Sequence, residues 1–290
     1  MFRRKDNGVM RNLGYYNGEI GLIEEMRVPM TDRGFYFGDG IYDAAYSRNH
    51  VIYALDEHID RFFGNLEKLD IRFAMDKAQL RTLLCELSLR VDDGEQFVYW
   101  QATRGSALRD HPYPSADVTA NLSVMIRPKK VMDIQKKLRL VTAEDKRYLY
   151  CNMKTINLLP SVLTAQKATA AGADECVLHR GERVTECSHS NVSMLSGGAF
   201  VTPPADEYIL PGVGRAHLMA ASRALGSPVE ERIFTMEELM AADEVIISSA
   251  GILGNAAYEI NTVPVGGKDG ATLSRLQAYV KTDWLEKTTK

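Results

Sequence analysis

The chain has 290 residues, of which 45% are hydrophobic and 25% are charged. This balance is typical of a globular protein, and the length suits one large domain or two smaller domains with cores of their own; we expect two. The 35 lysines and arginines are outnumbered by 38 acidic residues and scattered among them, which gives a net charge of −3. Because no basic stripe is available to a phosphate backbone, we expect no nucleic-acid partner.

Signals for export, membrane insertion and metal binding are weak in the sequence. The segment Met1–Gly8 is basic but is not followed by an apolar stretch, and no run approaches the ~18 apolar residues of a membrane span. The four cysteines form no CxxC pair and the six histidines form no HxH or HExxH pair. We therefore expect a cytoplasmic protein with reduced thiols, without a bound metal and without a membrane partner.

The first half of the chain is predicted to contain short strands and two helices. Apolar residues at Ile59, Phe62, Phe63 and Leu66 have the spacing of an amphipathic helix, and Asp56 suits its N-cap. The patterns predict, in chain order, a hairpin at 15–20, a tight extended segment at 35–43, helices starting near 56 and 76, and strands at 97–103 and 118–126 that flank a loop at 104–114.

A polar, proline-bearing stretch then suggests a linker between two domains. We predict an N-terminal domain at 1–128, a linker at 129–137 and a C-terminal domain at 138–290. In the second domain the patterns predict strands near 138–142, 175–178, 192–195 and 244–248, and helices near 161–171, 214–225, 236–241 and 273–285. The mixture of elements is typical of the α+β class.

Two charged residues stand in surroundings that suit catalysis. Lys154 is the only charged residue between Cys151 and Pro160, so partial burial could lower its pKa and free its amine to form an imine. A lysine whose head reaches water remains the alternative. Glu186 precedes a polar cluster at 187–191, where a carboxylate could keep a pyridine nitrogen protonated, although such a cluster is also typical of a turn.

Other positions could bind anions. Gly212-Val213-Gly214 leads directly into a helical pattern, whose first N–H groups could bind a phosphate, and His217 in place of a third glycine argues against a dinucleotide motif. Arg61 lies beside the apolar face of the first predicted helix. Arg109 and His111 lie on a loop braced by prolines and could bind a carboxylate. Each position also has an ordinary structural reading, as a turn, a solvated helix face or a surface loop.

Taken together and in this order, these motifs resemble those of the class IV (fold type IV) pyridoxal-phosphate aminotransferases, and among them the D-amino-acid transaminases of bacteria. The resemblance covers nearly the whole chain. It implies a two-domain α+β fold with the active site between the domains. It rests on Asp32–Tyr42, Glu57–Arg61, the Arg109-x-His111 loop, Lys154 with Asn157–Leu159, Val184–Glu186 with Ser190–Asn191, and Gly212–Arg215.

The resemblance implies roles in binding pyridoxal 5'-phosphate. Lys154 would form the internal aldimine and later move the proton between the substrate Cα and the cofactor. Glu186 would pair with the pyridine nitrogen, and Arg147 would approach the ring hydroxyl. Arg61 and the backbone amides of Val213 and Gly214 would hold the phosphate.

The resemblance also implies the substrates and the assembly. Tyr42, Arg109 and His111 match a trap for the carboxylate of D-amino acids, in which the partner subunit contributes the Arg/His loop, so a homodimer is implied. Because the side on which the carboxylate is fixed decides which face receives the proton, such a trap sets the enantiomer. We expect a transaminase that uses small, D-alanine-type donors and 2-oxo acids such as pyruvate or 2-oxoglutarate.

Several positions depart from the D-specific pattern. Gly214 and Ala250 occupy positions where relatives commonly offer a threonine hydroxyl to the phosphate, at about 1 kcal/mol per lost hydrogen bond. Ser248 or Ser249 could compensate. Asp43 replaces the usual glutamate after the tyrosine, and Cys187 replaces a smaller residue after Glu186, so the pocket could differ on both sides.

Three other functions remain open on the sequence alone. A branched-chain L-amino-acid aminotransferase shares the fold, but Arg109 with His111 argues against it. An enzyme similar to 4-amino-4-deoxychorismate lyase would share the lysine and need no second oxo acid. A relative that binds the cofactor weakly or not at all is made conceivable by the two missing hydroxyls.

Overall fold

The structure is a computed structural model that describes residues 10–289, so the basic segment Met1–Gly8 lies outside the described residues. The chain forms two compact units. The first unit runs to Lys130 and also includes Met153–Asn157 and the C-terminal end from Glu286. The second unit consists of Val131–Asn152 and Leu158–Leu285.

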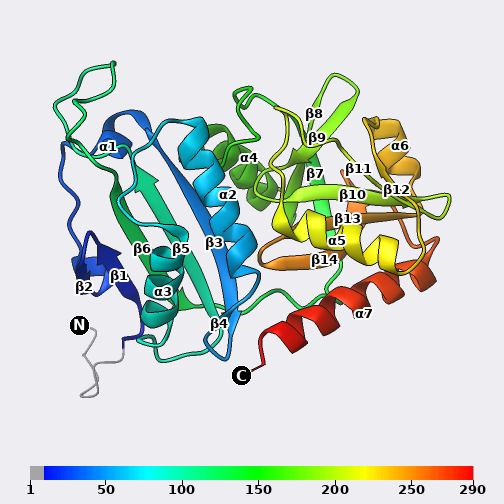
Figure 1. Cartoon of the computed structure of the whole chain (residues 1–290). Helices are drawn as coiled ribbons and strands as arrows, with labels where there is room; N and C mark the ends of the chain where they lie inside the picture. Colours follow the sequence, from blue (N-terminus) through cyan, green and yellow to red (C-terminus); the bar gives the residue numbers. More distant parts are fainter. Residues whose placement is uncertain (1–9, 290) are drawn as a thin grey trace. The chain divides into compact units, whose positions relative to one another are not determined.

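The first unit is built on a six-stranded antiparallel sheet (Figure 1). In spatial order the strands are β2 (Glu19–Gly21), β1 (Leu13–Tyr16), β6 (Asn121–Pro128), β5 (Gln96–Thr103), β3 (Gly40–Arg48) and β4 (Val51–Ile52). The predicted hairpin at 15–20 is present as β1 and β2. The predicted strand at 118–126 starts three residues too early, because β6 begins only at Asn121.

Helices α2 (Leu55–Lys68) and α3 (Lys77–Ser88) cover one face of this sheet, as Figure 1 shows. Phe62 and Leu84 from the helices pack with Trp100 of β5 in one apolar core, which explains the predicted spacing of the helices. Asp76 caps α3 and Gln79 completes a capping box. The other face carries Tyr42, Tyr99 and Gln101, because side chains alternate along β3 and β5.

The expectation of an extended segment at 35–43 was wrong for its first half. Arg33–Phe37 forms a short helix, α1, which the carboxylate of Asp32 caps by accepting from the Gly34 amide. Gly38 ends the helix in the left-handed conformation (φ 63°), which glycine adopts without strain. Only from Gly40 onward, in β3, is the chain extended. A short 3-10 helix, η1, covers Ile23–Glu25.

The second unit contains a nine-stranded mixed sheet. Its main path is β12 (Val229–Glu231), β11 (Ala199–Thr202), β10 (Asn191–Ser196), β13 (Glu244–Ser249), β14 (Ile252–Ile260), β7 (Leu138–Glu144), β8 (Glu175–Arg180) and β9 (Arg183–Cys187), with β15 (Val263–Pro264) paired to β14. Strands β7 and β8 are parallel and are joined by α4 (Leu159–Ala170), as a parallel pair requires a crossover.

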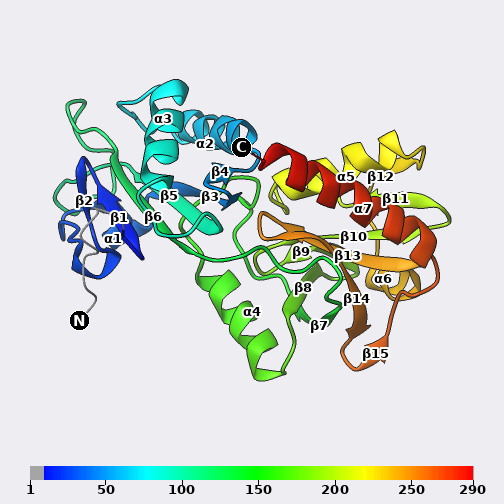
Figure 2. The ribbon, with the colours of Figure 1, turned by 90° about the horizontal axis from the view of Figure 1, so that it is seen from below.

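Three further helices complete the second unit. Helices α5 (Val213–Ala224) and α7 (Gly270–Lys287) pack on one apolar cluster, and both lie on the same side of the sheet in Figure 2. Helix α6 (Met236–Ala241) packs on a second cluster through Leu239. Helix α4 contributes Ala168 to a third, with Cys176 and Leu178 of β8. No helix in the part of the chain that the structure describes is long and apolar enough to span a membrane.

The Lys154 segment differs from the predicted arrangement, in which the lysine belongs to the C-terminal domain. Met153–Asn157 groups with the first unit because it pairs with the start of β3. The Tyr42 amide donates to the carbonyl of Lys154 (2.9 Å), and the Ile156 amide donates to the carbonyl of Gly40 (3.1 Å). The change from first to second unit at Lys130 falls inside the predicted linker, whose exact bounds stay a prediction.

The turn between β9 and β10 is held by a buried carboxylate. Glu175 is 1% exposed and accepts hydrogen bonds from the hydroxyls of Ser188 and Ser190, the latter at 2.7 Å, and contacts His189 Nδ1 at 2.7 Å. Burial alone would raise the pKa of Glu175, but its hydrogen bond and charge interaction with His189, together with Ser188, lower the pKa below its usual value.

Replacing this carboxylate should therefore weaken the fold in a pH-dependent way. A carboxyl whose pKa is lower in the folded state than in the unfolded state stabilises the fold at pH values above the unfolded-state pKa. This contribution is lost as the pH falls through the folded-state pKa. We expect Glu175→Gln to lose about 1–3 kcal/mol at pH 7, measured by urea unfolding followed by tryptophan fluorescence, and the loss to shrink below about pH 4.5. Glu230→Gln, at an exposed pair with Arg232, is the control; an equal loss at pH 7 in both variants would contradict the assignment.

Candidate functional site

Lys154 lies against Tyr42 on the face of the first sheet opposite to helices α2 and α3, here called the open face. Its Nζ is 4.2 Å from the centroid of the Tyr42 ring, within the range of a cation–π contact. The backbone pairing of 153–157 with β3 fixes this approach, because the residue that donates to the Lys154 carbonyl is Tyr42 itself. Lys154 is half-buried, so its amine is neither fully solvated nor locked in the core.

A second tyrosine supports the first. The rings of Tyr42 and Tyr99 stack with centroids 5.3 Å apart, and the Tyr99 hydroxyl donates to Gln101 Oε1 at 2.7 Å. Burial, with a smaller contribution from Tyr42, raises the pKa of Tyr99 well above its usual value, so its hydroxyl stays protonated. The stack limits the orientations that Tyr42 can adopt beside Lys154.

On the helix-covered face, Arg61 is held by a carboxylate that the sequence did not identify as its partner. Asp43 is fully buried and accepts from Arg61 Nε at 2.9 Å and from Arg61 Nη2 at 2.7 Å. His58 Nδ1 lies 2.8 Å from the same carboxylate. Burial opposes ionisation of Asp43, but the charges of Arg61 and His58 hold its pKa far below the usual value.

His58 contacts both Asp43 and Arg61 and also experiences the charge of Lys154. Burial lowers the pKa of His58, Asp43 opposes this, and the positive charges of Arg61 and Lys154 lower it further. The structure therefore brings three predicted site residues, Tyr42, Arg61 and Lys154, into one part of the first unit. A sequence signal for His58 existed, because a residue three positions before Arg61 shares its helix face.

Arg109 and His111 lie on an exposed loop of the first unit. The guanidinium carbon of Arg109 is 5.0 Å from the centroid of the Phe37 ring, and the His111 ring centroid is 5.3 Å from it. Within the described part of the chain, these contacts join the loop to α1 and not to Lys154 or Tyr42. The predicted carboxylate trap is thus present as two separate pieces of the unit, and its assembly stays a prediction.

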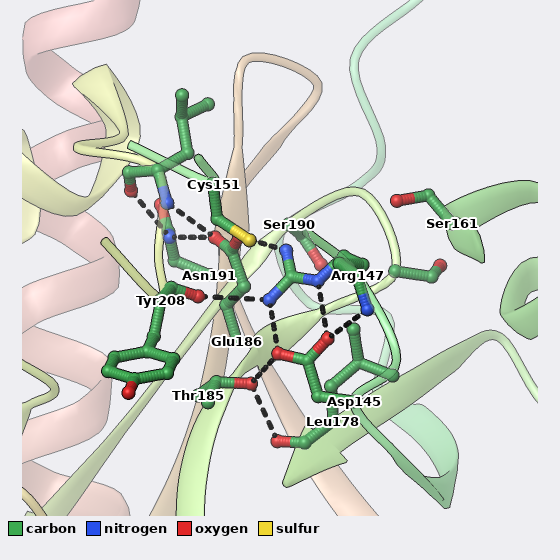
Figure 3. A network of polar contacts seen from close by, with 12 residues as sticks. Asp145, Arg147, Cys151, Ser161, Leu178, Thr185, Glu186, Ser190, Asn191 and Tyr208 are labelled. Carbon is green, nitrogen blue, oxygen red and sulfur yellow. Dashed lines mark hydrogen bonds and ion pairs between the residues drawn. The ribbon is translucent and has the colours of Figure 1, made fainter. Parts of the chain in front are cut away.

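In the second unit, Arg147 lies between two carboxylates, as Figure 3 shows. Its Nε and Nη2 bind Asp145 at 2.9 and 2.8 Å, and its Nη1 binds Glu186. Burial disfavours the charged forms of Arg147 and Asp145. Their mutual hydrogen bonds and opposite charges outweigh this effect, so the pKa of Arg147 is raised and that of Asp145 is lowered. Both members of the ion pair therefore stay charged.

Glu186 is fixed from its other side by Asn191. The Asn191 side-chain amide donates to Glu186 Oε2 at 2.8 Å and to the Leu210 carbonyl at 3.0 Å, and the Leu210 amide donates to the same Oε2 at 3.1 Å. Glu186 is 5% exposed. The sequence predicted Glu186 and Arg147 as cofactor residues, included Asn191 in a motif without giving it a role, and did not identify Asp145, although Asp145 is only two residues from Arg147.

The first turn of α5 lies against the end of β13. A Cβ on Gly214 would be 3.0 Å from the carbonyl oxygen of Ser249, and one on Gly212 would overlap the side chain of Asn191, so both positions favour glycine. Gly212 is the N-cap of α5 and supplies no side-chain cap. The nearby hydroxyl of Ser248 is buried and has no hydrogen-bond partner among the described residues.

This turn therefore has the properties of an anion site. Unsatisfied N–H groups at a helix start and an unpaired buried hydroxyl both suit phosphate oxygens. Arg215 does not take part, because its guanidinium binds Glu231, Thr202 and the Pro203 carbonyl. Over residues 10–289, no group of three or more His, Cys, Asp or Glu side chains could hold a metal ion.

Comparisons with known proteins agree with this reading. The family model described as amino-transferase class IV matches residues 40–254. The D-alanine aminotransferase of Listeria monocytogenes serotype 4b (strain F2365) is 37% identical over 268 residues, covering 91% of this chain and 93% of the relative. The D-alanine aminotransferase of Staphylococcus aureus (strain COL) is 34% identical over 272 residues, with coverage of 91% and 94%.

Solved structures share the fold at lower identity. The T.th. branched-chain amino acid aminotransferase with pyridoxamine 5'-phosphate matches with a TM-score of 0.86 and 21% identity over 96% of each chain. The branched-chain aminotransferase of Thermoproteus uzoniensis with norvaline matches with a TM-score of 0.85 and 20% identity over 95% of each chain. These matches confirm the predicted α+β, fold type IV architecture.

Enzymes of this family use pyridoxal 5'-phosphate and act on amino acids and 2-oxo acids, so the predicted family, enzyme class and cofactor are confirmed. The reading of the chain as a relative without catalytic activity is set aside. On its sequence match and its fold, this chain belongs to the class IV aminotransferases.

Proposed function

We propose that this aminotransferase exchanges amino groups between small D-amino acids, such as D-alanine, and 2-oxo acids such as pyruvate or 2-oxoglutarate. The observation that carries the proposal is the position of Lys154, whose amine β3 holds over the Tyr42 ring. The D-alanine aminotransferases of two bacterial genera, 34–37% identical over about nine-tenths of the chain, support the choice of substrate.

Lys154 is the residue that attaches the cofactor and handles the proton. When bound, pyridoxal 5'-phosphate supplies an electron sink that stabilises the substrate once its Cα proton has left. The Nζ of Lys154 takes up that proton and returns it during the exchange. The Tyr42–Tyr99 stack restricts the direction from which Nζ approaches.

Glu186 and Arg147 fit the ring of the cofactor. A carboxylate that stays ionised beside a pyridine nitrogen keeps that nitrogen protonated. Glu186 is held by Arg147, Asn191 and the Leu210 amide, so its orientation is set before the cofactor arrives. Arg147 in turn is fixed by Asp145, and we assign it to the ring hydroxyl of the cofactor.

The phosphate end fits as well, as the unpaired Ser248 hydroxyl indicates. A buried hydroxyl without a partner is rare and costs stability, which a phosphate oxygen would relieve. With it we assign the amides of Val213 and Gly214, the segment Ser249–Ala250, and Arg61. Asp43 orients Arg61 by two hydrogen bonds to its guanidinium.

We assign the preference for D-amino acids to Tyr42, Arg109 and His111, which would together bind the substrate carboxylate. A branched-chain L-amino-acid aminotransferase remains the rival, since the solved structures above act on that class, but at 20–21% identity they indicate the fold alone. The pair of cationic groups on one loop favours the D-specific reading. The relatives at 34–37% identity are D-alanine aminotransferases, which favours an aminotransferase over the lyase alternative.

A titration with the two enantiomers of alanine tests this function. We expect the yellow absorbance band of the bound cofactor to disappear with D-alanine, and kcat/KM to favour D-alanine over L-alanine on the order of 100-fold. Lys154→Ala should lose the band and lower kcat by about 10⁴. Lys154→Arg, which keeps the charge without the reactive amine, should behave in the same way. A preference for L-alanine would overturn the assignment of handedness.

The phosphate assignment predicts that a threonine changes cofactor affinity at Ala250 but not at Gly214. Ala250→Thr restores a hydroxyl at a half-buried position and should tighten pyridoxal 5'-phosphate binding about fivefold. Gly214→Thr should give no gain, because its Cβ would crowd the Ser249 carbonyl. Ser248→Ala should weaken binding. Equilibrium dialysis of the three variants measures this, and unchanged affinity in Ser248→Ala would contradict the role of that hydroxyl.

We also propose that the enzyme is a homodimer whose partner subunit supplies the Arg109–His111 loop. Helix α4 presents an outward apolar face, in which Leu159, Val162 and Leu163 are 68%, 59% and 63% exposed. Such a face on one helix is typical of a protein–protein interface. A second copy of the chain is the occupant that the shared trap requires.

Light scattering after size-exclusion chromatography tests the assembly. We expect a mass of twice 32.4 kDa for the unaltered chain and a shift toward 32.4 kDa for Leu163→Glu, because burying a charge at an apolar interface is costly. Leu89→Glu, at an exposed leucine outside α4, is the control and should leave the mass unchanged. A single-chain mass for the unaltered protein would rule out the dimer.

A further inference from the structure

We infer that the segment Asp32–Gly40 positions the loop that carries Arg109 and His111, and that Arg33 is the residue on which this positioning depends. The segment is part of the motif that first suggested the family, yet none of the roles assigned so far uses its charged residues. The consequence for substrate binding rests on the proposed function of Arg109 and His111 as carboxylate ligands.

Arg33 connects the helix to the tip of the loop. Its side chain is 4% exposed, and its Nε donates to Asp39 Oδ2 at 2.8 Å. Its Nη1 donates to the Asp110 carbonyl at 2.7 Å and its Nη2 to the His111 carbonyl at 3.4 Å. One guanidinium thus holds two successive backbone carbonyls of an exposed loop, directly beside the two predicted substrate ligands.

Phe37 packs beneath the side chains of the same loop. Its ring centroid lies 5.0 Å from the Arg109 guanidinium, 5.3 Å from the His111 ring and 4.9 Å from the Arg33 guanidinium. Arg33 and Phe37 are four residues apart in α1, so both side chains lie on one face of that helix. The helix therefore supports the backbone of the loop through Arg33 and its side chains through Phe37.

Asp39 completes the support by joining two arginines. Its carboxylate accepts from Arg33 and, at 2.9 Å, from Arg104 Nε. The Nη1 and Nη2 of Arg104 donate to the carbonyls of Asp70 and Leu69, respectively. Arg104 is 7% exposed and begins the loop. Because a buried guanidinium without a carboxylate is costly, loss of Asp39 would disturb both arginines.

The base of the loop is fixed by backbone hydrogen bonds to this segment and to Thr31, which precedes it. The Arg33 amide donates to the Gly105 carbonyl at 2.9 Å, and the Ala107 amide donates to the Thr31 carbonyl at 3.0 Å. At its tip Arg109, Asp110 and His111 are exposed, so few apolar contacts hold the loop there. The hydrogen bonds from Arg33 restrain the backbone of the tip, in addition to the contacts that Phe37 makes with its side chains, and restraint before binding lowers the entropy lost on binding a carboxylate.

Hydrogen exchange of the full chain tests the positioning without reference to activity. Arg33→Met keeps the length of the side chain and its contact with Phe37 but removes all its donors. We expect the peptide covering 104–114 to exchange about tenfold faster in this variant. Arg81→Met, which removes an arginine from an exposed pair with Asp56, is the matched control and should leave that peptide unchanged.

Kinetics with D-alanine then test the consequence. Arg33→Met should raise the KM for D-alanine about tenfold, and we expect Arg109→Ala to do the same, with kcat changed less than about threefold and the affinity for pyridoxal 5'-phosphate unchanged. Adding Arg33→Met to Arg109→Ala should raise KM no further, since Arg33 acts through the loop. A merely structural role would instead lower stability and cofactor affinity and add to the effect of Arg109→Ala.

The outcomes separate the inference from the proposed function. Unchanged exchange of 104–114 in Arg33→Met, or a normal KM in that variant while Arg109→Ala is impaired, overturns the inference. Faster exchange with a normal KM in both variants supports the positioning and overturns the role of the loop in substrate binding. If Arg33→Met does not fold, Arg33→Lys, which keeps one ion pair with Asp39 but cannot bridge to both carbonyls, should show the same pattern at a smaller size.

Discussion

A charge removed from water must be paired, and this constraint governs every part of the candidate site. Asp43 holds Arg61, Asp145 holds Arg147, and Asp39 holds Arg33 together with Arg104. Such pairs add little net stability, because desolvation offsets most of the attraction. What they provide is orientation, since a planar guanidinium bound at two atoms has few remaining directions.

The pairs fix the side chains to which the proposed function gives roles. Asp145 accepts from Arg147, Asn191 donates to Glu186, and Asp43 accepts from Arg61. Removing one member would leave the other charge buried without compensation, at a cost of about 3–5 kcal/mol.

The sequence predicted the helices and strands better than it predicted which side chains bind the residues that it singled out. Helices such as α3 follow from local signals, because Asp76 and Gln79 form their capping box within one turn. Helix α1 was missed since it is only five residues long and depends on Asp32 and Gly38 rather than on apolar spacing. Asp43 was noticed only as a departure from the family pattern, because its pairing with Arg61 forms only when β3 packs against α2.

Strand β3 carries, at successive positions, the neighbour of Lys154 and the carboxylate that binds Arg61. Successive side chains of a strand point to opposite faces, so Tyr42 meets Lys154 on the open face while Asp43 meets Arg61 and His58 under α2. A shift of one residue in its pairing with β5 would exchange these faces and leave Asp43 without its partners. The buried ion pair with Arg61 thus favours the observed strand register, which also brings Tyr42 beside Lys154. In this unit, the orientation of Arg61, the proposed phosphate ligand, and the orientation of Tyr42, the neighbour of Lys154, therefore depend on a single strand.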